Sequence, residues 1–364
     1  MGWYEIPMMA GVGRSVFHPL QVAAIDPLTD DAVAITFDVP AELAADFAFE
    51  AGQHVTLRCV AAGDDARRTY SLCSRPGVLR IGVRQVAGGV FSRHALTALK
   101  IGDEVEVMPP RGRFVSGLDN SLPRHRGGIV AGSGVTPVLS IVASTLESEP
   151  SSTFTLIYAN RTVQTVMFLD DLADLKDRFP NRLAIFHVLS REARESPLLS
   201  GRLDRAKLRS LLDTIGGPPI DEWFVCGPHE FTELAGSVLH DRGVDDAVVH
   251  RELFYLGTDE SPHADNEPTS EGATSAVTMI LAGRSTELTV PVDGDVLHVA
   301  MTVRPDVPYG CTNGMCGTCR AKVIEGRVEM HHCYALTDAE VAAGFVLTCQ
   351  ARPRTDRVVL DYDA

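Results

Sequence analysis

The stretch Tyr309-Gly310-Cys311-Thr312-Asn313-Gly314-Met315-Cys316-Gly317-Thr318-Cys319 decides how the rest of the chain is interpreted. Its cysteines have the spacing C-x4-C-x2-C, and Cys349 follows as a fourth. This is the ligand spacing of plant-type [2Fe–2S] clusters, in which four thiolates converge on two irons and two sulfides. The glycines of the loop let backbone N–H groups approach the sulfur atoms. The spacing therefore predicts a [2Fe–2S] cluster held by Cys311, Cys316, Cys319 and Cys349.

Two other metal sites compete with the cluster. Four cysteines also suit a structural zinc ion, but zinc ligands usually come as two C-x2-C pairs, and here only Cys316 and Cys319 form one. His331-His332-Cys333 resembles a metal-binding tract as well. The interval from Cys319 to Cys349 fits a cluster better, so we interpret the tract as a polar turn with one spare cysteine.

The overall composition restricts the class of protein. At 364 residues the chain is longer than one typical core, which predicts two or three domains. The sequence has no apolar run long enough to span a bilayer and no signal-peptide pattern at its start, so we expect a cytoplasmic protein without a membrane partner. Its eight cysteines then favour metal or redox use over disulfides. The net charge of −15 argues against a nucleic-acid partner, because phosphates bind a basic face.

Three patterns follow one another along the chain after an N-terminal extension at residues 1–16. Residues 17–121 contain short alternating segments that predict an antiparallel β-barrel. Residues 122–256 alternate buried strands with helices, which predicts a doubly wound parallel sheet. An acidic segment at 257–276 predicts a flexible linker before an α+β domain at 277–364. The expected strands are Val33–Val39, His54–Val60, Thr69–Cys73, Val78–Gln85, Glu104–Met108, Gly128–Ala131, Thr153–Tyr158, Leu183–Leu189, Trp223–Cys226, Val277–Leu281, Thr286–Val290 and Arg357–Tyr362. The expected helices are Pro137–Glu147, Leu169–Phe179 and Val296–Met301.

Two motifs in the first domain suit a flavin. In Arg67-Arg68-Thr69-Tyr70-Ser71-Leu72-Cys73-Ser74 an arginine can pair with a pyrophosphate, the tyrosine can stack on isoalloxazine, and a serine can hydrogen-bond the ring edge. One strand later, Gly88-Gly89-Val90-Phe91-Ser92 predicts a glycine turn that opens a helix and can hold phosphates. The first motif alone could be an ordinary half-buried strand, but the pair predicts a flavin site. The predicted flavin-binding residues are Arg68, Thr69, Tyr70, Ser71, Val83, Gly88, Gly89, Val90 and Ser92.

A glycine turn in the second domain suits a dinucleotide. Gly132-Ser133-Gly134-Val135-Thr136-Pro137 joins a strand to a helix, with Thr136 as the predicted N-cap and Pro137 as the predicted first helical residue. At the next two strand ends, Asn160-Arg161 and Ser190-Arg191 replace the acidic residue that binds the ribose of NAD. Hydroxyl and guanidinium groups suit a 2′-phosphate and favour NADPH over NADH, although the two arginines could simply be solvated. The predicted nucleotide-binding residues are Gly132, Ser133, Gly134, Thr136, Arg161, Ser190 and Arg191.

Cys226-Gly227-Pro228 follows the fourth expected strand, where small residues would let a nicotinamide reach the flavin. Cys226 could instead be a nucleophile, but no histidine or acidic partner is evident nearby in the sequence, and we reject that alternative.

Together these motifs resemble the ferredoxin–NADP reductase superfamily fused to a C-terminal plant-type ferredoxin, from about residue 17 onward. Arg68–Ser71 resembles its flavin motif, Gly132–Pro137 its nicotinamide motif, Cys226–Pro228 its cysteine–glycine turn and Glu252–Phe254 the end of its reductase module. The resemblance implies an FAD-binding barrel, an NADP-binding α/β domain and a β-grasp ferredoxin domain. It also implies roles for single residues: Tyr70 stacks on the flavin, Ser71 bonds near its reactive nitrogen, Cys226 and Glu252 flank the hydride path, Phe254 covers the ring, and Gly227 and Pro228 complete the cofactor site.

More narrowly, five segments resemble the family of phenylacetyl-CoA epoxidase reductase components: Ala131–Ser140, His187–Glu192, Cys319–Met330, Phe345–Gln350 and Val358–Tyr362. This resemblance implies FAD, a [2Fe–2S] cluster, NADPH as donor and a di-iron oxygenase as acceptor, in phenylacetate catabolism. The His-His-Cys run departs from that family's pattern. A reductase for another oxygenase, such as a Rieske steroid hydroxylase, is the alternative within this class. A zinc-stabilised, non-enzymatic interaction protein is the alternative from another class.

Overall fold

The computed structural model describes residues 17–59, 66–118, 122–217, 219–254 and 273–364. The predicted N-terminal extension and most of the predicted linker lie outside these residues. Internal contacts divide the chain into two compact units, one at His18–Ser261 and one that contains Pro262–Ala364. Every described helix is too short or too polar to cross a membrane.

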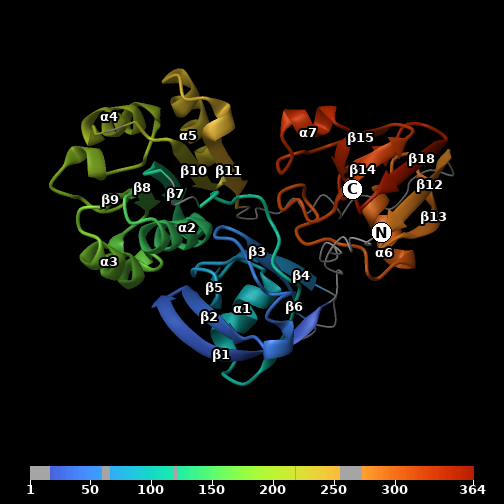
Figure 1. Cartoon of the computed structure of the whole chain (residues 1–364), viewed down its shortest axis with the longest axis horizontal. Helices are drawn as coiled ribbons and strands as arrows, with labels where there is room; N and C mark the ends of the chain where they lie inside the picture. The colour runs from blue at the N-terminus through green and yellow to red at the C-terminus, as the bar shows by residue number, and fades with distance from the viewer. Residues whose placement is uncertain (1–16, 60–65, 119–121, 218, 255–272) are drawn as a thin grey trace, which may run out of the picture. The chain divides into compact units, whose positions relative to one another are not determined.

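The first module of the larger unit is an antiparallel β-barrel (Figure 1). Its sheet has the order β4-β3-β6-β1-β2-β5, and an isolated bridge between Leu72 and Ile81 joins the two ends of that order. Apolar side chains on alternating positions fill the interior, because successive residues of a strand point to opposite faces. The elements are β1 His18–Thr29, β2 Ala32–Asp38, β3 His54–Cys59, β4 Ala66–Ser71, β5 Leu79–Arg84, α1 Val90–Thr97 and β6 Glu104–Val107.

The second module is a five-stranded parallel sheet of order β11-β10-β7-β8-β9. Neighbouring residues of β7 pack on opposite faces: Val130 contacts the cluster that includes α2 and α3, and Ile129 the cluster that includes α4 and α5. Helices therefore cover both faces, as expected for a doubly wound fold. The strands are β7 His125–Ala131, β8 Thr153–Asn160, β9 Leu183–Leu189, β10 Glu222–Gly227 and β11 Val249–Leu253, and the helices are α2 Val135–Ser148, α3 Leu169–Arg178, α4 Arg205–Ile215 and α5 His229–Asp241.

The start of α2 differs from the prediction. Gly132–Gly134 forms a 3-10 turn, Gly134 is the N-cap and the helix begins at Val135. Thr136 is therefore not the cap; it lies inside the helix and its hydroxyl donates to Ser133 O at 3.0 Å. Pro137 is the third helical residue, where its missing N–H is one of the groups that a first turn leaves without an intrahelical partner.

Polar and packing contacts join the barrel to the α/β module. Arg80 on β5 pairs with Asp171 on α3 at 2.7 Å, and Arg84 Nη2 donates to Thr165 O at 2.6 Å. Between them, Gly82 leaves room for the ring of Phe168, since a Cβ there would lie 2.8 Å from that ring. These contacts hold β5 beside the carboxyl side of the parallel sheet.

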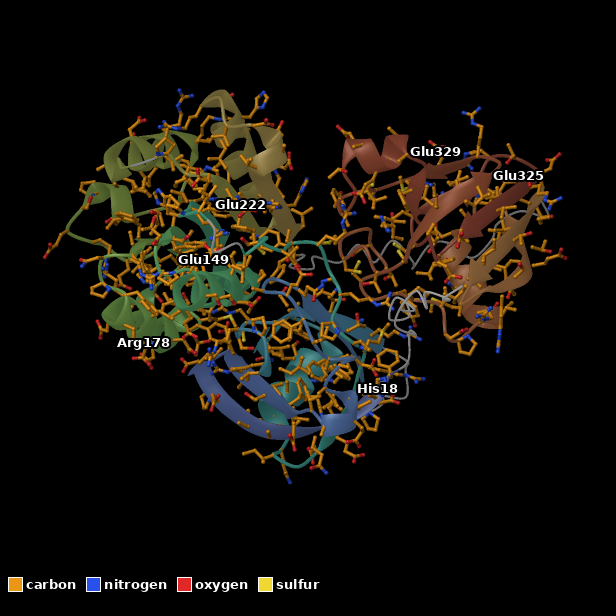
Figure 2. The ribbon with its side chains drawn as sticks, viewed as in Figure 1. His18, Glu149, Arg178, Glu222, Glu325 and Glu329 are labelled. Atoms are coloured by element: carbon orange, nitrogen blue, oxygen red, sulfur yellow. The ribbon has the colours of Figure 1, made fainter. Side chains whose placement is uncertain are left out.

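A buried ion network lies at the opposite, amino-terminal end of the sheet. Arg126 on β7 is completely buried and pairs with Glu149 at 2.5 Å and with Glu222 on β10 at 3.1 Å. Figure 2 labels both glutamates. Glu222 also contacts His250 Nε2 at 2.8 Å and accepts from Ser116 at 3.1 Å. Because each buried charge has a partner, the network holds β7, β10 and β11 in register at their first residues.

The smaller unit is a β-grasp ferredoxin fold. Its main sheet has the order β13-β12-β18-β14-β16, with β12 and β18 parallel and the other pairs antiparallel. β12 begins at Thr274, so residues 274–276 of the predicted linker belong to a strand. The elements are β12 Thr274–Leu281, β13 Arg284–Pro291, α6 Val296–Val303, β14 Arg320–Glu325, β15 Val328–Met330, α7 Asp338–Ala342, β16 Phe345–Leu347, β17 Ala351–Pro353 and β18 Arg357–Asp361.

Candidate functional site

The predicted flavin motif lies on β4, at one end of the barrel sheet's strand order. Tyr70 pairs in register with Val55 of β3 and packs beside Phe91 of α1, with ring centroids 5.4 Å apart. Arg68 is exposed, and its guanidinium donates to the carbonyl of Arg67 at 2.7 Å. The buried hydroxyl of Thr69 has no hydrogen-bond partner among the described residues. A polar ligand would satisfy that hydroxyl, so the strand fits a flavin.

The predicted phosphate turn precedes α1. Gly88 has φ +70°, and Gly89 is the N-cap without a side-chain hydrogen bond to the first turn. Ser92 accepts from Val86 N at 3.2 Å, which holds the turn closed behind the helix start. The N–H groups of Val90 and its neighbours therefore remain suited to an anion. The side chain of Val83, by contrast, is completely buried in the barrel core, a place that suits packing beneath the site.

The chain also brings together residues that the sequence separates widely. Ser71 Oγ donates to Glu252 Oε1 at 3.3 Å, which joins the barrel to the end of β11. Cys226 pairs in register with Glu252 across β10 and β11, and Phe254 N donates to Gly227 O at 2.8 Å. Direct contacts, strand register and chain adjacency therefore link the four residues for which the resemblance implies catalytic roles: Tyr70, Ser71, Cys226 and Glu252.

Cys226 is completely buried. Burial, reinforced by the Glu252 carboxylate, raises the pKa of its thiol well above the ordinary value. The neutral thiol is therefore the form present at neutral pH, and a neutral thiol is a poor nucleophile.

The nicotinamide turn is tightly packed. Gly132 has φ +56°, and its carbonyl accepts from Tyr158 OH at 3.0 Å. A Cβ on Gly134 would lie 2.4 Å from Cys226 O, so only glycine fits against the cysteine turn. Pro228 is the N-cap of α5, the helix that follows this turn. The glycine turn and the cysteine turn thus approach each other at the carboxyl ends of β7 and β10, where doubly wound folds bind ligands.

The two predicted strand tips lie side by side. Pairing continues past β8 and β9, because Ser190 N donates to Asn160 O at 2.9 Å and Arg191 N to Arg161 O at 2.8 Å. All three side chains of the predicted 2′-phosphate site are exposed: those of Arg161, Ser190 and Arg191. Within the described ranges neither arginine has an acidic partner within ion-pair distance. Two exposed guanidinium groups at adjacent tips fit a phosphate dianion.

The cysteine loop directs backbone N–H groups at its own sulfurs. Cys316 N and Met315 N donate to Cys311 Sγ at 3.2 and 3.3 Å, and Cys311 N and Thr318 N to Cys316 Sγ at 3.4 and 3.5 Å. Gly314 and Gly317 have φ of +79° and +69°, which allows this wrapping. N–H groups that point at thiolate sulfurs fit an iron–sulfur ligand loop.

Neighbouring cysteines and burial raise the pKa of two predicted ligands, Cys311 and Cys349. Hydrogen bonding to Cys316, together with burial, raises the pKa of Cys311 well above its usual range. Hydrogen bonding to Cys319, again together with burial, does the same for the pKa of Cys349. The positive charge of bound irons would offset these increases in pKa. In the described part of the chain, no group of three or more His, Cys, Asp or Glu side chains is arranged to hold a single metal ion.

Sequence reasoning missed several residues around these sites. Glu192 accepts from Val163 N at 2.8 Å and pins the strand tips together, and Arg84 lies against Gly132. Gln350 contacts the cysteine loop. Glu192 ends the segment His187–Glu192, which carries part of the narrower family resemblance. A polar residue directly after the tip of β9 could have indicated its role. No local sequence pattern around Arg84 predicted its contact with Gly132.

Comparison with known proteins agrees with this architecture. Residues 19–115 match the oxidoreductase FAD-binding domain family, residues 129–236 the oxidoreductase NAD-binding domain family and residues 279–354 the 2Fe-2S iron-sulfur cluster binding domain family. The chain therefore binds FAD, a pyridine nucleotide and a [2Fe–2S] cluster.

Relatives match over nearly the whole length. A component of the 1,2-phenylacetyl-CoA epoxidase of Escherichia coli is 41% identical over 96% of this chain and 99% of its own. The ferredoxin reductase component of 3-ketosteroid-9-alpha-monooxygenase from Rhodococcus rhodochrous is 33% identical over 96% and 97%. The solved structure of phthalate dioxygenase reductase is 25% identical, with a TM-score of 0.58 over 95% of this chain and 98% of that one. The chain belongs to the ferredoxin–NADP reductase superfamily, as an NAD(P)H-dependent FAD and [2Fe–2S] oxidoreductase with a C-terminal iron–sulfur domain.

Proposed function

We propose that this chain is the reductase component of a phenylacetyl-CoA epoxidase complex, and that it carries electrons from NADPH to a di-iron oxygenase component. The observation that carries the proposal is the 41% identity to a component of the Escherichia coli epoxidase across nearly the full length of both chains. A match that includes the barrel, the α/β module and the iron–sulfur domain supports a shared role more strongly than a match to one module would.

The residues of the barrel and the cysteine turn would prepare the hydride step. When bound, FAD accepts a hydride and releases electrons singly, and the cluster takes up one electron at a time. Tyr70 offers a ring for stacking, and Ser71, oriented by Glu252, offers a hydroxyl to the ring edge. Cys226 would supply a small neutral side chain beside the hydride path, and Phe254 would cover the flavin ring.

The nucleotide preference would be set at the paired strand tips. Ser190, Arg161 and Arg191 would bind the 2′-phosphate that distinguishes NADPH from NADH. A charge-assisted hydrogen bond contributes about 1.5–3 kcal/mol, so we expect Arg191→Ala to lower kcat/KM for NADPH by roughly 10- to 100-fold with little change for NADH. Arg202→Ala is the matched control, because Arg202 is a highly exposed arginine of the same module that pairs with Glu230. An unchanged preference in Arg191→Ala would contradict the assignment.

The cysteine loop would be the exit for electrons, with Cys311, Cys316, Cys319 and Cys349 as ligands. Thr312, Asn313 and Met315 lie between the first two cysteines, and all three are half-buried. We expect these residues to contact the acceptor.

The acceptor is tested by reconstitution. The purified reductase is mixed with the oxygenase of a phenylacetyl-CoA epoxidase and, separately, with that of a 3-ketosteroid 9α-monooxygenase. We expect NADPH oxidation coupled to epoxide formation in the first mixture and slow, uncoupled NADPH oxidation in the second. Coupled turnover with the steroid enzyme alone would favour the second candidate, a steroid monooxygenase reductase, which the 33% relative supports.

A further inference from the structure

Gln350 follows the fourth predicted cluster ligand and is 4% exposed. Its side-chain amide donates to Thr312 O at 3.0 Å and to Cys349 O at 2.9 Å, and it lies 3.8 Å from Cys349 Sγ. Two carbonyl oxygens can only accept hydrogen bonds, so the amide must present its nitrogen to them. The amide has two N–H bonds for three acceptors, so one N–H is shared between a carbonyl oxygen and the ligand sulfur.

The loop that Gln350 holds is in an unusual backbone conformation. Thr312 has φ +59°, which a β-branched residue adopts only when its surroundings impose it. A Cβ on Gly314 would lie 3.2 Å from Gln350 Cγ, so the glutamine stem packs directly on that glycine.

The same residue also contacts the His-His-Cys turn. His331 N donates to Gln350 O at 3.2 Å, and Tyr334 N and Ala335 N both donate to Gly314 O at 3.2 Å. Three segments thus meet at Gln350: the cysteine loop, the turn at 348–350 that carries the fourth cysteine, and the turn at 331–335. The backbone of that last turn therefore supports the cysteine loop.

We infer that Gln350 is a positioning residue that holds the cysteine loop through Thr312 and directs an N–H dipole at the cluster, thereby raising the cluster's reduction potential. The inference rests on the four-cysteine ligand set proposed above. Reduction adds one negative charge to the cluster, and hydrogen bonds and N–H dipoles near its sulfurs favour that charge. Without the amide the cluster should be harder to reduce at the same loop geometry.

Two substitutions separate packing from the dipole. Gln350→Met keeps the length and approximate volume of the side chain but removes the donor, and Gln350→Glu adds a negative charge that faces two carbonyl oxygens. At a fixed solution potential, we expect the ratio of reduced to oxidised cluster to fall about fivefold in Gln350→Met and about tenfold in Gln350→Glu. For a one-electron couple these changes correspond to about 40 and about 59 mV.

The control is Ser275→Ala. Ser275 is also buried in the iron–sulfur unit and donates to a backbone carbonyl, that of Thr355, at 2.6 Å, but neither residue belongs to the cysteine loop. We expect it to lower stability without shifting the potential. A native potential in Gln350→Met with full cluster content, or an equal shift in Ser275→Ala, would overturn the inference.

A measurement on the unaltered sequence covers the case in which Gln350→Met fails to retain its cluster. Gln350 is the only glutamine between residues 273 and 364. Full-length protein made by cell-free synthesis with amide-15N glutamine is reduced, and pulsed electron paramagnetic resonance is used to detect coupling between the cluster's unpaired electron and the labelled nitrogen. A resolved 15N coupling is expected, and its absence would overturn the inference. Failure of the unaltered protein to show [2Fe–2S] bands at all would instead refute the proposed ligand set.

Discussion

Gly134→Ala tests the close approach of the nicotinamide turn to the cysteine turn. Gly134 has φ −61° and ψ −6°, so an alanine would adopt the backbone without strain and the whole effect is steric. The added Cβ would lie 2.4 Å from Cys226 O, 2.6 Å from Cys226 C and 2.9 Å from Gly227 N. All three are backbone atoms of β10 and cannot rotate away as a side chain would.

The size of the effect follows from these distances. Carbon atoms in contact normally lie about 3.5 Å or more from their neighbours, so the turn or β10 must move by about 1 Å. Overpacking of this kind costs about 1–3 kcal/mol of unfolding free energy. A displacement of about 1 Å at a reacting centre lowers the rate of the chemical step by about 100-fold.

The assay is anaerobic stopped-flow reduction of the flavin by NADPH, with FAD content and iron–sulfur absorption measured on the same sample. We expect hydride transfer to slow by about 100-fold while both absorption bands persist, because the barrel and the cysteine loop are untouched. Gly117→Ala is the control, since a Cβ there has no described atom within 4 Å. A native rate of flavin reduction in Gly134→Ala would refute the packing argument.

Three further predictions concern the ion network and the cysteines. Glu149→Gln leaves the buried charge of Arg126 partly unpaired and should lower the free energy of unfolding by about 3–5 kcal/mol in urea titrations; an effect below about 1 kcal/mol would contradict it. Burial alone would raise the pKa of Glu222, but hydrogen bonds from its partners lower that pKa below 4.5. The contribution of Glu222 to the free energy of unfolding is therefore present above about pH 4.5 and is lost as the pH falls further. Glu222→Gln should reduce the acid sensitivity of the urea midpoint, and unchanged sensitivity would count against this. Cys349→Ser should abolish native cluster content while Cys333→Ser retains it, as measured by iron and sulfide analysis, and the reverse outcome would reassign the fourth ligand.

Local patterns predicted most of the elements correctly. The cysteine loop was identifiable from spacing alone, because cluster ligation imposes a fixed interval on neighbouring residues. The expected strand Leu183–Leu189 matches β9, since its ends coincide with a change from apolar to polar residues. The start of α2 was predicted wrongly, because a threonine before a proline imitates a cap while the true constraint is the contact between Gly134 and β10.

The contacts that complete the site could not be predicted in the same way. Ser71 and Glu252 are 181 residues apart, and only the closed fold brings them within hydrogen-bond distance. Gln350 is similar, because its partner Thr312 lies 38 residues earlier in the chain. The chain also forms β11, α4 and α5, which local patterns did not predict as elements.

An anaerobic titration with NADPH, followed by visible absorption and electron paramagnetic resonance, tests the central claim most directly. A chain that converts a hydride into single electrons should take up about three electron equivalents, about two on the flavin and about one on the cluster. The flavin and iron–sulfur bands should both bleach, and a reduced [2Fe–2S] signal should appear in the same sample. Bleaching of the flavin without any cluster signal, or a colourless protein, would contradict the account.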